Sequence, residues 1–182
     1  MTRPISDQTV LVTGAGRGLG AAIARAFHRE GAKVAINYRN SRAAAEALAT
    51  ELGPRAAAFN ADVTSPEQVR AMVDQITKRF GAPDVLVHNA LADFALNGDA
   101  RTHLDRLSWA DIARQTETSV GGALNCLQAI QTHCAVQGFG RIIMIGTNLM
   151  QNPVVPYHDY TAAKGALLAF TRTVNRPLFI GG

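Results

Sequence analysis

Short apolar segments alternate with longer amphipathic segments along almost the whole chain. The apolar segments predict five β-strands, at Thr9–Thr13, Lys33–Asn37, Ala56–Asn60, Val85–His88 and Arg141–Ile145. Helical periodicity predicts helices between them, at about Gly18–Arg29, Ser41–Leu52, Pro66–Phe80, Trp109–Val136 and Tyr157–Asn175. Strands of continuous apolar character that alternate with helices indicate a parallel sheet covered on both faces. We therefore expect a single doubly wound α/β domain formed by residues 1–182.

Two sequence signals mark helix starts. Ser65 precedes Pro66, which suits the first helical position, and Gln68 is placed to complete a capping box on Ser65. Ser108 and Asp111 form a second capping signal of similar form.

A glycine-rich turn, from Thr13 to Gly20, separates the first predicted strand from the first predicted helix. Glycines let a backbone turn tightly and approach a pyrophosphate, whose charge the N-terminus of the following helix stabilises. A glycine-rich turn on its own is more often only a turn. Between a buried strand and a helix, it predicts a dinucleotide phosphate site.

Tyr160 and Lys164 lie four residues apart on a predicted helix, so their side chains share one face. A cation beside a phenol favours the phenolate, which suits a phenol that protonates a carbonyl oxygen while hydride arrives at the carbon. Thr147 precedes this helix and offers a hydroxyl to the same oxygen. The alternative interpretation of Tyr160 and Lys164 is an ordinary surface pair.

Taken together, these motifs resemble those of the short-chain dehydrogenase/reductase family, which has a Rossmann fold, and within it the 3-oxoacyl-(acyl-carrier-protein) reductases. The TGxxxGxG motif of the family falls on Thr13, Gly14, Gly18 and Gly20. Its NNAG motif appears as His88-Asn89-Ala90-Leu91, and its acidic residue at the adenine pocket falls on Asp62. The resemblance extends from about residue 5 to about residue 175.

The resemblance implies a role for each matching residue. Tyr160 would be the general acid, Lys164 would assist it and hold the nicotinamide ribose, Thr147 would replace the family serine, and Ser119 would replace the family asparagine. Ser119 has no amide, so a water relay anchored there would have to be rebuilt. The implied cofactor-binding residues are Thr13, Gly14, Arg17, Gly18, Leu19, Gly20, Arg39, Asp62, Val63, Asn89, Ala90, Tyr160 and Lys164. Leu91 replaces a glycine and would either narrow the cofactor path or only reroute the loop that follows.

The second predicted strand points to NADP(H) as the cofactor. A site that prefers NAD places an acid there to bind the ribose 2′-hydroxyl, whereas this chain has no acid in Asn37–Ser41. Arg39 is placed to pair with a 2′-phosphate, and Arg17 is a second candidate cation. The alternative is that Arg39 is a solvated loop residue.

Composition narrows the function classes. The chain has 182 residues, 47% of them hydrophobic, which is enough for a sizeable core. Its net charge of +4 comes from dispersed residues, so we expect no nucleic-acid partner. No apolar run approaches the ~18 residues of a membrane span, and we expect neither a signal peptide nor a membrane partner. Cys126 and Cys134 are predicted to be reduced helix residues of a cytoplasmic protein, and the histidines have no metal-ligand spacing.

The C-terminus is short for the resembled family. The family's sixth and seventh strands, and the helices that shape its substrate pocket, have no counterpart here, and Leu178–Ile180 would at most form a stub of a sixth strand. Without a sixth strand, Arg141–Ile145 would become a sheet edge that invites pairing with another chain. The resemblance also implies oligomer contacts through the helix from Trp109 and the helix of Tyr160. We therefore expect a homo-oligomer.

These observations favour an NADPH-dependent reductase of a small or carrier-bound carbonyl compound, in the first place a 3-oxoacyl thioester. A reductase of sugars, steroids or other small ketones is the second hypothesis. The third, from another class, is a non-catalytic fragment that binds nucleotide weakly or only self-associates.

Overall fold

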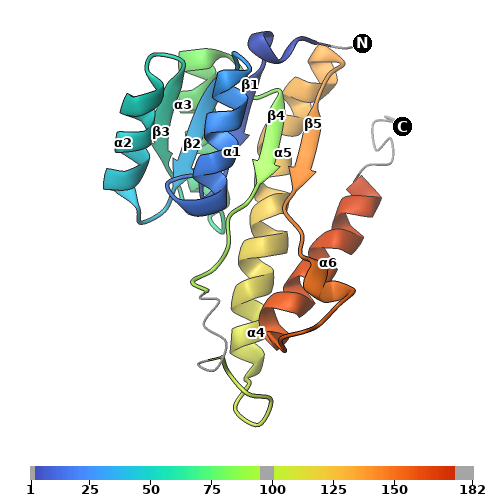
Figure 1. Ribbon diagram of the computed structural model, residues 1–182. Coiled ribbons are helices and arrows are strands. Elements are labelled where there is room, and N and C mark those ends of the chain that lie inside the picture. Colours follow the sequence, from blue (N-terminus) through green and yellow to red (C-terminus); the bar gives the residue numbers. More distant parts are fainter. Residues whose placement is uncertain (1–2, 95–100, 175–182) are drawn as a thin grey trace, which may run out of the picture.

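The computed structural model of the chain describes residues 3–94 and 101–174, and their strands form one parallel sheet (Figure 1). The strands are β1 (Thr9–Val12), β2 (Lys33–Tyr38), β3 (Ala56–Asn60), β4 (Val85–His88) and β5 (Arg141–Met144). Their order is β3-β2-β1-β4-β5, and every pair is parallel. The order reverses between β1 and β4, and ligands of such sheets bind beside this switch point, at the carboxyl ends of the strands. The predicted doubly wound α/β fold is confirmed.

The helices agree with the sequence prediction except in the centre of the chain. They are α1 (Gly18–Arg29), α2 (Arg42–Leu52), α3 (Pro66–Phe80), α4 (Trp109–Thr116), α5 (Gly122–Gln137) and α6 (His158–Val174), with short 3₁₀ turns η1 (Ile5–Asp7) and η4 (Asn148–Met150). The helix predicted as continuous from Trp109 contains a π-helical segment, η3 (Glu117–Gly121), between α4 and α5. The predicted end of α6, at Asn175, lies outside the described residues, as does the proposed strand stub at Leu178–Ile180.

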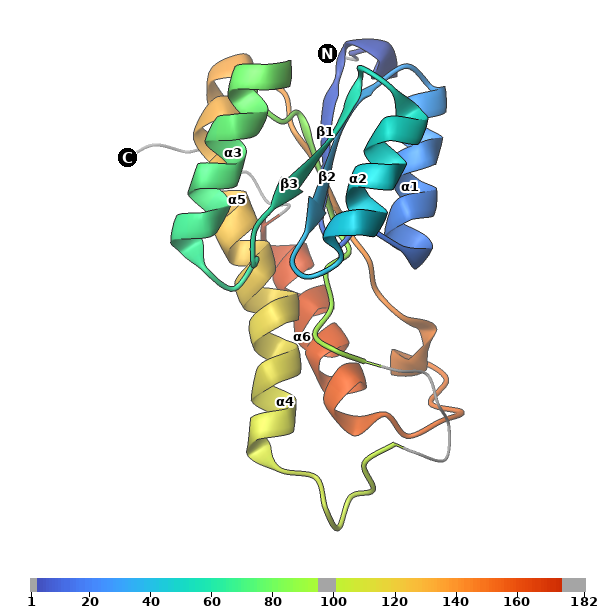
Figure 2. The ribbon, with the colours of Figure 1, turned by 90° about the vertical axis from the view of Figure 1, so that its left-hand side faces the viewer.

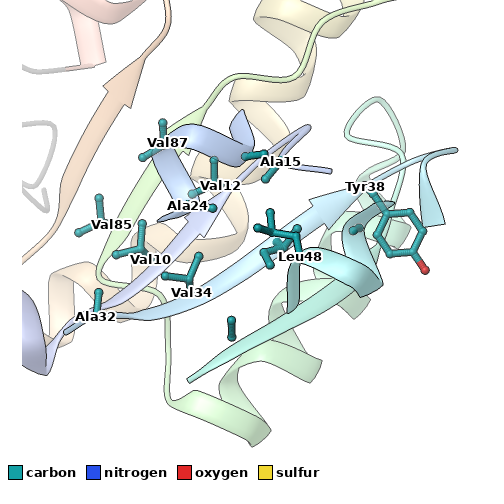
Figure 3. Packing of buried hydrophobic residues seen from close by; sticks show 14 residues of the cluster. Val10, Val12, Ala15, Ala24, Ala32, Val34, Tyr38, Leu48, Val85 and Val87 are labelled. Carbon is teal, nitrogen blue, oxygen red and sulfur yellow. The ribbon is translucent and has the colours of Figure 1, made fainter. Parts of the chain in front are cut away.

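The sheet is covered on both faces, so the apolar side chains of its central strands are buried on either side. Figure 2 shows α1 and α2 on one side of the sheet and α3 and α5 on the other. On the first side, Val10, Val12 and Val34 are completely buried and pack with Leu48 of α2 (Figure 3). On the second side, Leu11 and Leu86 pack against helix residues such as Met72 and Ile130. Each such side chain contributes about 1.5–3 kcal/mol to folding.

Two helices reach beyond the sheet. α4 and α6 lie side by side past the carboxyl ends of the strands, and η3 contacts α6 (Figures 1 and 2). In this helical extension, the first half of α6, which carries Tyr160, lies beyond the carboxyl ends of the strands.

The helix starts agree only in part with the predicted caps. Ser65 accepts a hydrogen bond from the Gln68 N–H, as predicted, but the capping box is wrong. The Gln68 side chain accepts from the Asp62 N–H at 2.9 Å, and the Ser65 N–H donates to the Asp62 carbonyl instead. Ser108 and Asp111 form the complete capping box that was predicted. None of the described helices combines the length and the apolar character that crossing a membrane requires.

Candidate active site

In the glycine-rich turn after β1, Gly14 and Gly20 have to be glycine for different reasons. Gly14 has a φ of +61°, in the left-handed region that side chains disfavour. A Cβ on Gly20 would lie 2.6 Å from the Gly14 carbonyl oxygen and 2.6 Å from the Asn89 Nδ2. The Asn89 amide in turn donates to the carbonyl oxygens of Thr13 and Gly14, at 3.0 and 3.2 Å. The turn is therefore held against the loop that follows β4.

A cavity of about 640 Å³ opens at this turn, beside the carboxyl ends of β1, β2 and β4. Seven of the predicted cofactor-binding residues line it: Gly14, Arg17, Gly18, Leu19, Gly20, Arg39 and Asn89. The remaining lining residues include Tyr38, Asn40, Ser41 and the four-residue segment Leu91–Phe94. Leu91 is therefore one of the residues of the cavity wall.

Arg39 lies between two carboxylates. Its guanidinium is 3.6 Å from an Asp62 oxygen and 3.5 Å from an Asp93 oxygen. Asp93 is 84% exposed, so its ion pair is weak and easily replaced by another anion. Sequence analysis missed Asp93, because it belongs to a loop 54 residues further along the chain.

Asp62 is anchored more firmly than Asp93. One of its oxygens accepts from the N–H and the hydroxyl of Thr64, at 2.9 and 2.8 Å. Partial burial raises the pKa of Asp62, but these hydrogen bonds and the charge of Arg39 outweigh it and lower the pKa overall. Six of the predicted cofactor-binding residues do not line the cavity: Thr13, Asp62, Val63, Ala90, Tyr160 and Lys164. Val63 packs under Gly122 instead.

Tyr160 and Lys164 lie close together, as their helical spacing requires. The Lys164 Nζ is 5.8 Å from the centre of the Tyr160 ring and donates to the Ile145 carbonyl oxygen at 2.6 Å. Lys164 is buried, and this burial lowers the pKa of its ammonium to about 8. The surface-pair interpretation is therefore wrong for Lys164.

Phe94 covers the Tyr160 ring. The two rings stack with centres 4.5 Å apart and planes 19° apart, and Phe94 also meets the edge of Tyr157, at 5.1 Å. Because Phe94 also lines the cavity, one residue contacts both the cavity and the candidate general acid. No signal in the sequence pointed to Phe94.

Thr147 and Ser119 occupy different surroundings. Thr147 begins η4, just past β5, and its hydroxyl oxygen accepts from the Leu149 N–H at 3.3 Å, which leaves its proton free to be donated. Ser119 lies in the π-helical segment η3, and its side chain is completely buried. Contacts between α6 and both η4 and η3 bring these two turns to the helix that carries Tyr160 and Lys164.

Comparison with known proteins assigns this arrangement to a family. A family model described as short chain dehydrogenase matches residues 8–179. The chain belongs to the short-chain dehydrogenase family.

Two curated relatives that are similar to this chain are reductases with different names. The 3-oxoacyl-(acyl-carrier-protein) reductase FabG of Staphylococcus epidermidis is 32% identical over 177 residues, which cover 94% of this chain and 69% of the relative. Versicolorin reductase stcU of Emericella nidulans is 35% identical over 173 residues, which cover 92% of this chain and 62% of the relative.

Solved structures of similar proteins are also dehydrogenases. A gluconate 5-dehydrogenase from Burkholderia cenocepacia, in complex with NADP and tartrate, is 32% identical with a TM-score of 0.80, covering 92% of this chain and 64% of that one. A short chain dehydrogenase from Bacillus anthracis is 26% identical with a TM-score of 0.83, covering 94% of this chain and 68% of that one. The chain thus spans about two thirds of the length of these short-chain dehydrogenases.

One further residue of this short-chain dehydrogenase stands out. His88 is completely buried, and its Nδ1 lies 3.3 Å from the Thr13 hydroxyl oxygen. Burial lowers the pKa of His88 to about 4, and the charge of Lys164 adds to this effect, while the nearby main-chain carbonyls of Thr118 and Ser119 oppose it. Sequence analysis recorded His88 only as a departure from the NNAG motif.

Proposed function

We propose that this protein is an NADPH-dependent carbonyl reductase. The observation that carries the proposal is the placement of Tyr160 and buried Lys164 on one helix beyond the carboxyl ends of the strands, connected through Phe94 to a cavity lined by the glycine-rich turn. Membership of the short-chain dehydrogenase family, and a relative solved with NADP, support the same interpretation.

The residues around the cavity fit a dinucleotide. Gly20 lets the start of α1 pack closely against Gly14 and Asn89, and this helix N-terminus at the cavity would hold a pyrophosphate. Arg39 and Arg17 line the same cavity and would bind the 2′-phosphate that distinguishes NADPH from NADH. A 2′-phosphate would take the place of the exposed Asp93 carboxylate on Arg39. Bound NADPH would supply the hydride.

The side chains of this chain would handle the proton and the substrate oxygen. Tyr160 would donate its phenolic proton to the carbonyl oxygen. The Lys164 ammonium, held by the Ile145 carbonyl, would stabilise the negative charge that develops on the phenol oxygen. Thr147 keeps a proton to donate and would orient the same carbonyl group.

The substrate we propose first is a 3-oxoacyl thioester, because FabG of Staphylococcus epidermidis is 32% identical across nearly the whole chain. A specific observation favours a second candidate, a cyclic aromatic ketone. Versicolorin reductase is 35% identical, and the Tyr160 ring has an aromatic ring, that of Phe94, stacked on it, whose place a flat substrate would take.

The test measures NADPH oxidation by the purified protein with acetoacetyl-coenzyme A and with a polycyclic aromatic ketone. Tyr160→Phe should lower turnover by roughly 100-fold or more, because only the proton donor is lost. Its NADPH affinity by calorimetry should stay within a few-fold. Tyr157→Phe removes a hydroxyl three residues away and is the matched control, which should retain turnover.

Retained turnover in Tyr160→Phe would refute the mechanism. If the protein binds NADPH normally but oxidises it with neither of the two ketones, the reductase assignment is refuted and the cofactor site remains in place.

A further inference from the structure

Asn37 is a polar side chain buried near the end of an apolar strand. It is the next-to-last residue of β2, and only 1% of it is exposed. The three residues before it, Val34–Ile36, are apolar and completely buried. A buried amide destabilises the folded state unless its donor and its acceptor are both paired. The hydrogen bonds of Asn37 therefore indicate its role.

The first partner of Asn37 is the glycine-rich turn. The Asn37 Oδ1 accepts from the Gly14 N–H at 3.2 Å, and the Asn37 main-chain carbonyl accepts from the Ala15 N–H at 2.8 Å. Gly14 has a positive φ and lines the cavity. One residue of β2 therefore holds two consecutive N–H groups of the turn, just after the end of β1.

The second partner is the chain that leaves β3. The Asn37 Nδ2 donates to the Ala61 carbonyl oxygen at 3.0 Å. Ala61 immediately precedes Asp62, whose carboxylate pairs with Arg39 at 3.6 Å. Arg39 itself follows Asn37 by two residues and lines the cavity. A single amide thus joins the glycine-rich turn to the segments that carry Arg39 and Asp62.

These two partners also fix the orientation of the amide and its chemistry. The oxygen of an amide accepts hydrogen bonds, whereas its nitrogen donates them. Gly14 offers an N–H and Ala61 offers a carbonyl, so exchanging the oxygen and the nitrogen of the Asn37 amide would break both bonds. A carboxylate has no proton for Ala61, and an apolar side chain can pair with neither partner.

We propose that Asn37 is a positioning residue for NADPH, which keeps the glycine-rich turn at a fixed distance from the Arg39–Asp62 pair. The pyrophosphate and the 2′-phosphate of NADPH are attached to the same ribose, so the groups that bind them have to be correctly spaced before the cofactor arrives. Asn37 does not line the cavity and would act through its two partners. This inference rests on the proposed function, because it takes NADPH as the ligand.

The test compares two variants with the wild type by calorimetry with NADPH. Asn37→Leu has a similar volume and loses both side-chain bonds, so it should bind NADPH roughly 5- to 10-fold more weakly. Asn37→Asp keeps the acceptor for Gly14 but has no donor for Ala61, and it should also bind more weakly. Urea unfolding shows whether each variant is folded under the assay conditions.

Kinetics separate a positioning role from a general loss of stability. In both variants the KM for NADPH should rise, whereas kcat at saturating NADPH should stay within a few-fold, because the catalytic helix is unchanged. Thr9→Val is the matched control. Thr9 is also buried, and its hydroxyl donates to the Phe80 carbonyl at 3.1 Å, but it lies at the opposite end of the sheet. Its replacement should lower stability at an unchanged KM for NADPH.

A further measurement needs no variant. In the wild type without NADPH, the Gly14 N–H should exchange slowly with deuterium, because the Asn37 side chain accepts its hydrogen bond. Rapid exchange of the Gly14 N–H would overturn the proposal, as would a folded Asn37→Leu variant with the NADPH affinity of the wild type. A protein that binds NADPH but reduces no ketone would refute the proposed function, while calorimetry would still decide the role of Asn37.

Discussion

Lys164 and His88 are ionisable side chains buried in one region, and burial disfavours the charged form of both. It lowers the pKa of Lys164 to about 8 and, together with the Lys164 charge, that of His88 to about 4. The two residues therefore differ in charge at neutral pH, with the imidazole neutral and the ammonium mostly charged.

The first prediction concerns acid stability. His88 has its ordinary pKa of 6.5 when the chain is unfolded and about 4 when it is folded, so between these values the unfolded chain binds a proton that the folded chain does not. Stability is therefore full above pH 6.5 and falls as the pH falls towards 4. The total amounts to roughly 3 kcal/mol, of which about 2 kcal/mol is lost between pH 7 and pH 5.

Urea unfolding at the two pH values measures this loss in the wild type and in His88→Gln. The variant lacks the titrating ring, so its loss over the same interval should be smaller by that amount. Equal losses in the two proteins would contradict the low pKa of His88.

The second prediction concerns cofactor choice at Arg39. Arg39→Ala should weaken NADPH binding by roughly 10- to 100-fold, because charge-assisted hydrogen bonds contribute about 1.5–3 kcal/mol. NADH binding should change little, since NADH has no 2′-phosphate. Calorimetry with both cofactors measures this, and Arg70→Ala on α3, where Arg70 pairs with Glu67, is the matched control. Equal affinities of the wild type for NADPH and NADH would rule out this use of Arg39.

At the scale of elements, the Leu91–Phe94 segment connects two parts of the site. Asp93 pairs with Arg39 at the cofactor cavity, and Phe94 stacks on Tyr160. NADPH and the substrate would each have to displace one of these contacts. We therefore expect this segment to compete with both ligands.

The third prediction tests this competition at Phe94. A stacked aromatic pair contributes about 0.5–1.5 kcal/mol, so Phe94→Ala should lower the KM for the ketone by a few-fold with little change in kcat. Phe94→Tyr keeps the ring and should behave like the wild type. A rise in KM in Phe94→Ala would show instead that Phe94 holds the substrate, and would contradict competition.

At the scale of the whole molecule, the sheet ends in an exposed strand. In the part of the chain that the structure describes, β5 pairs only with β4, and Ile143 is 40% exposed. Trp109 at the start of α4 and Leu124 in α5 are also exposed. An open strand edge and exposed apolar side chains each favour association with a second copy.

The fourth prediction is that the protein self-associates through this edge. Light scattering should show a dimer or larger species, and Ile143→Lys should shift it towards monomer, because an edge lysine opposes strand pairing. Val154→Lys places the same charge on an exposed residue of the loop before α6 and should have little effect. A monomeric wild type would contradict this prediction.

The sequence by itself determined the succession of strands and helices along the chain and the position of the glycine-rich turn. Each depends on residues close together in the chain. The buried apolar residues Val10, Leu11 and Val12 of β1, for example, lead directly into a turn that has a positive φ at Gly14. Helical spacing likewise fixed Tyr160 beside Lys164. Local pattern was sufficient because backbone geometry repeats every two residues in strands and every 3.6 in helices.

Only the tertiary structure decided how the site is arranged. The Phe94 ring on Tyr160, the Asp93 carboxylate on Arg39 and the Thr13 hydroxyl on His88 join residues 54 to 75 positions apart. The π-helical segment at Ser119 also went unpredicted, because helical periodicity does not show where one helical turn widens. Such contacts follow from how the strands and helices pack, and the hydrophobic pattern fixes which faces are buried but not which polar atoms then meet.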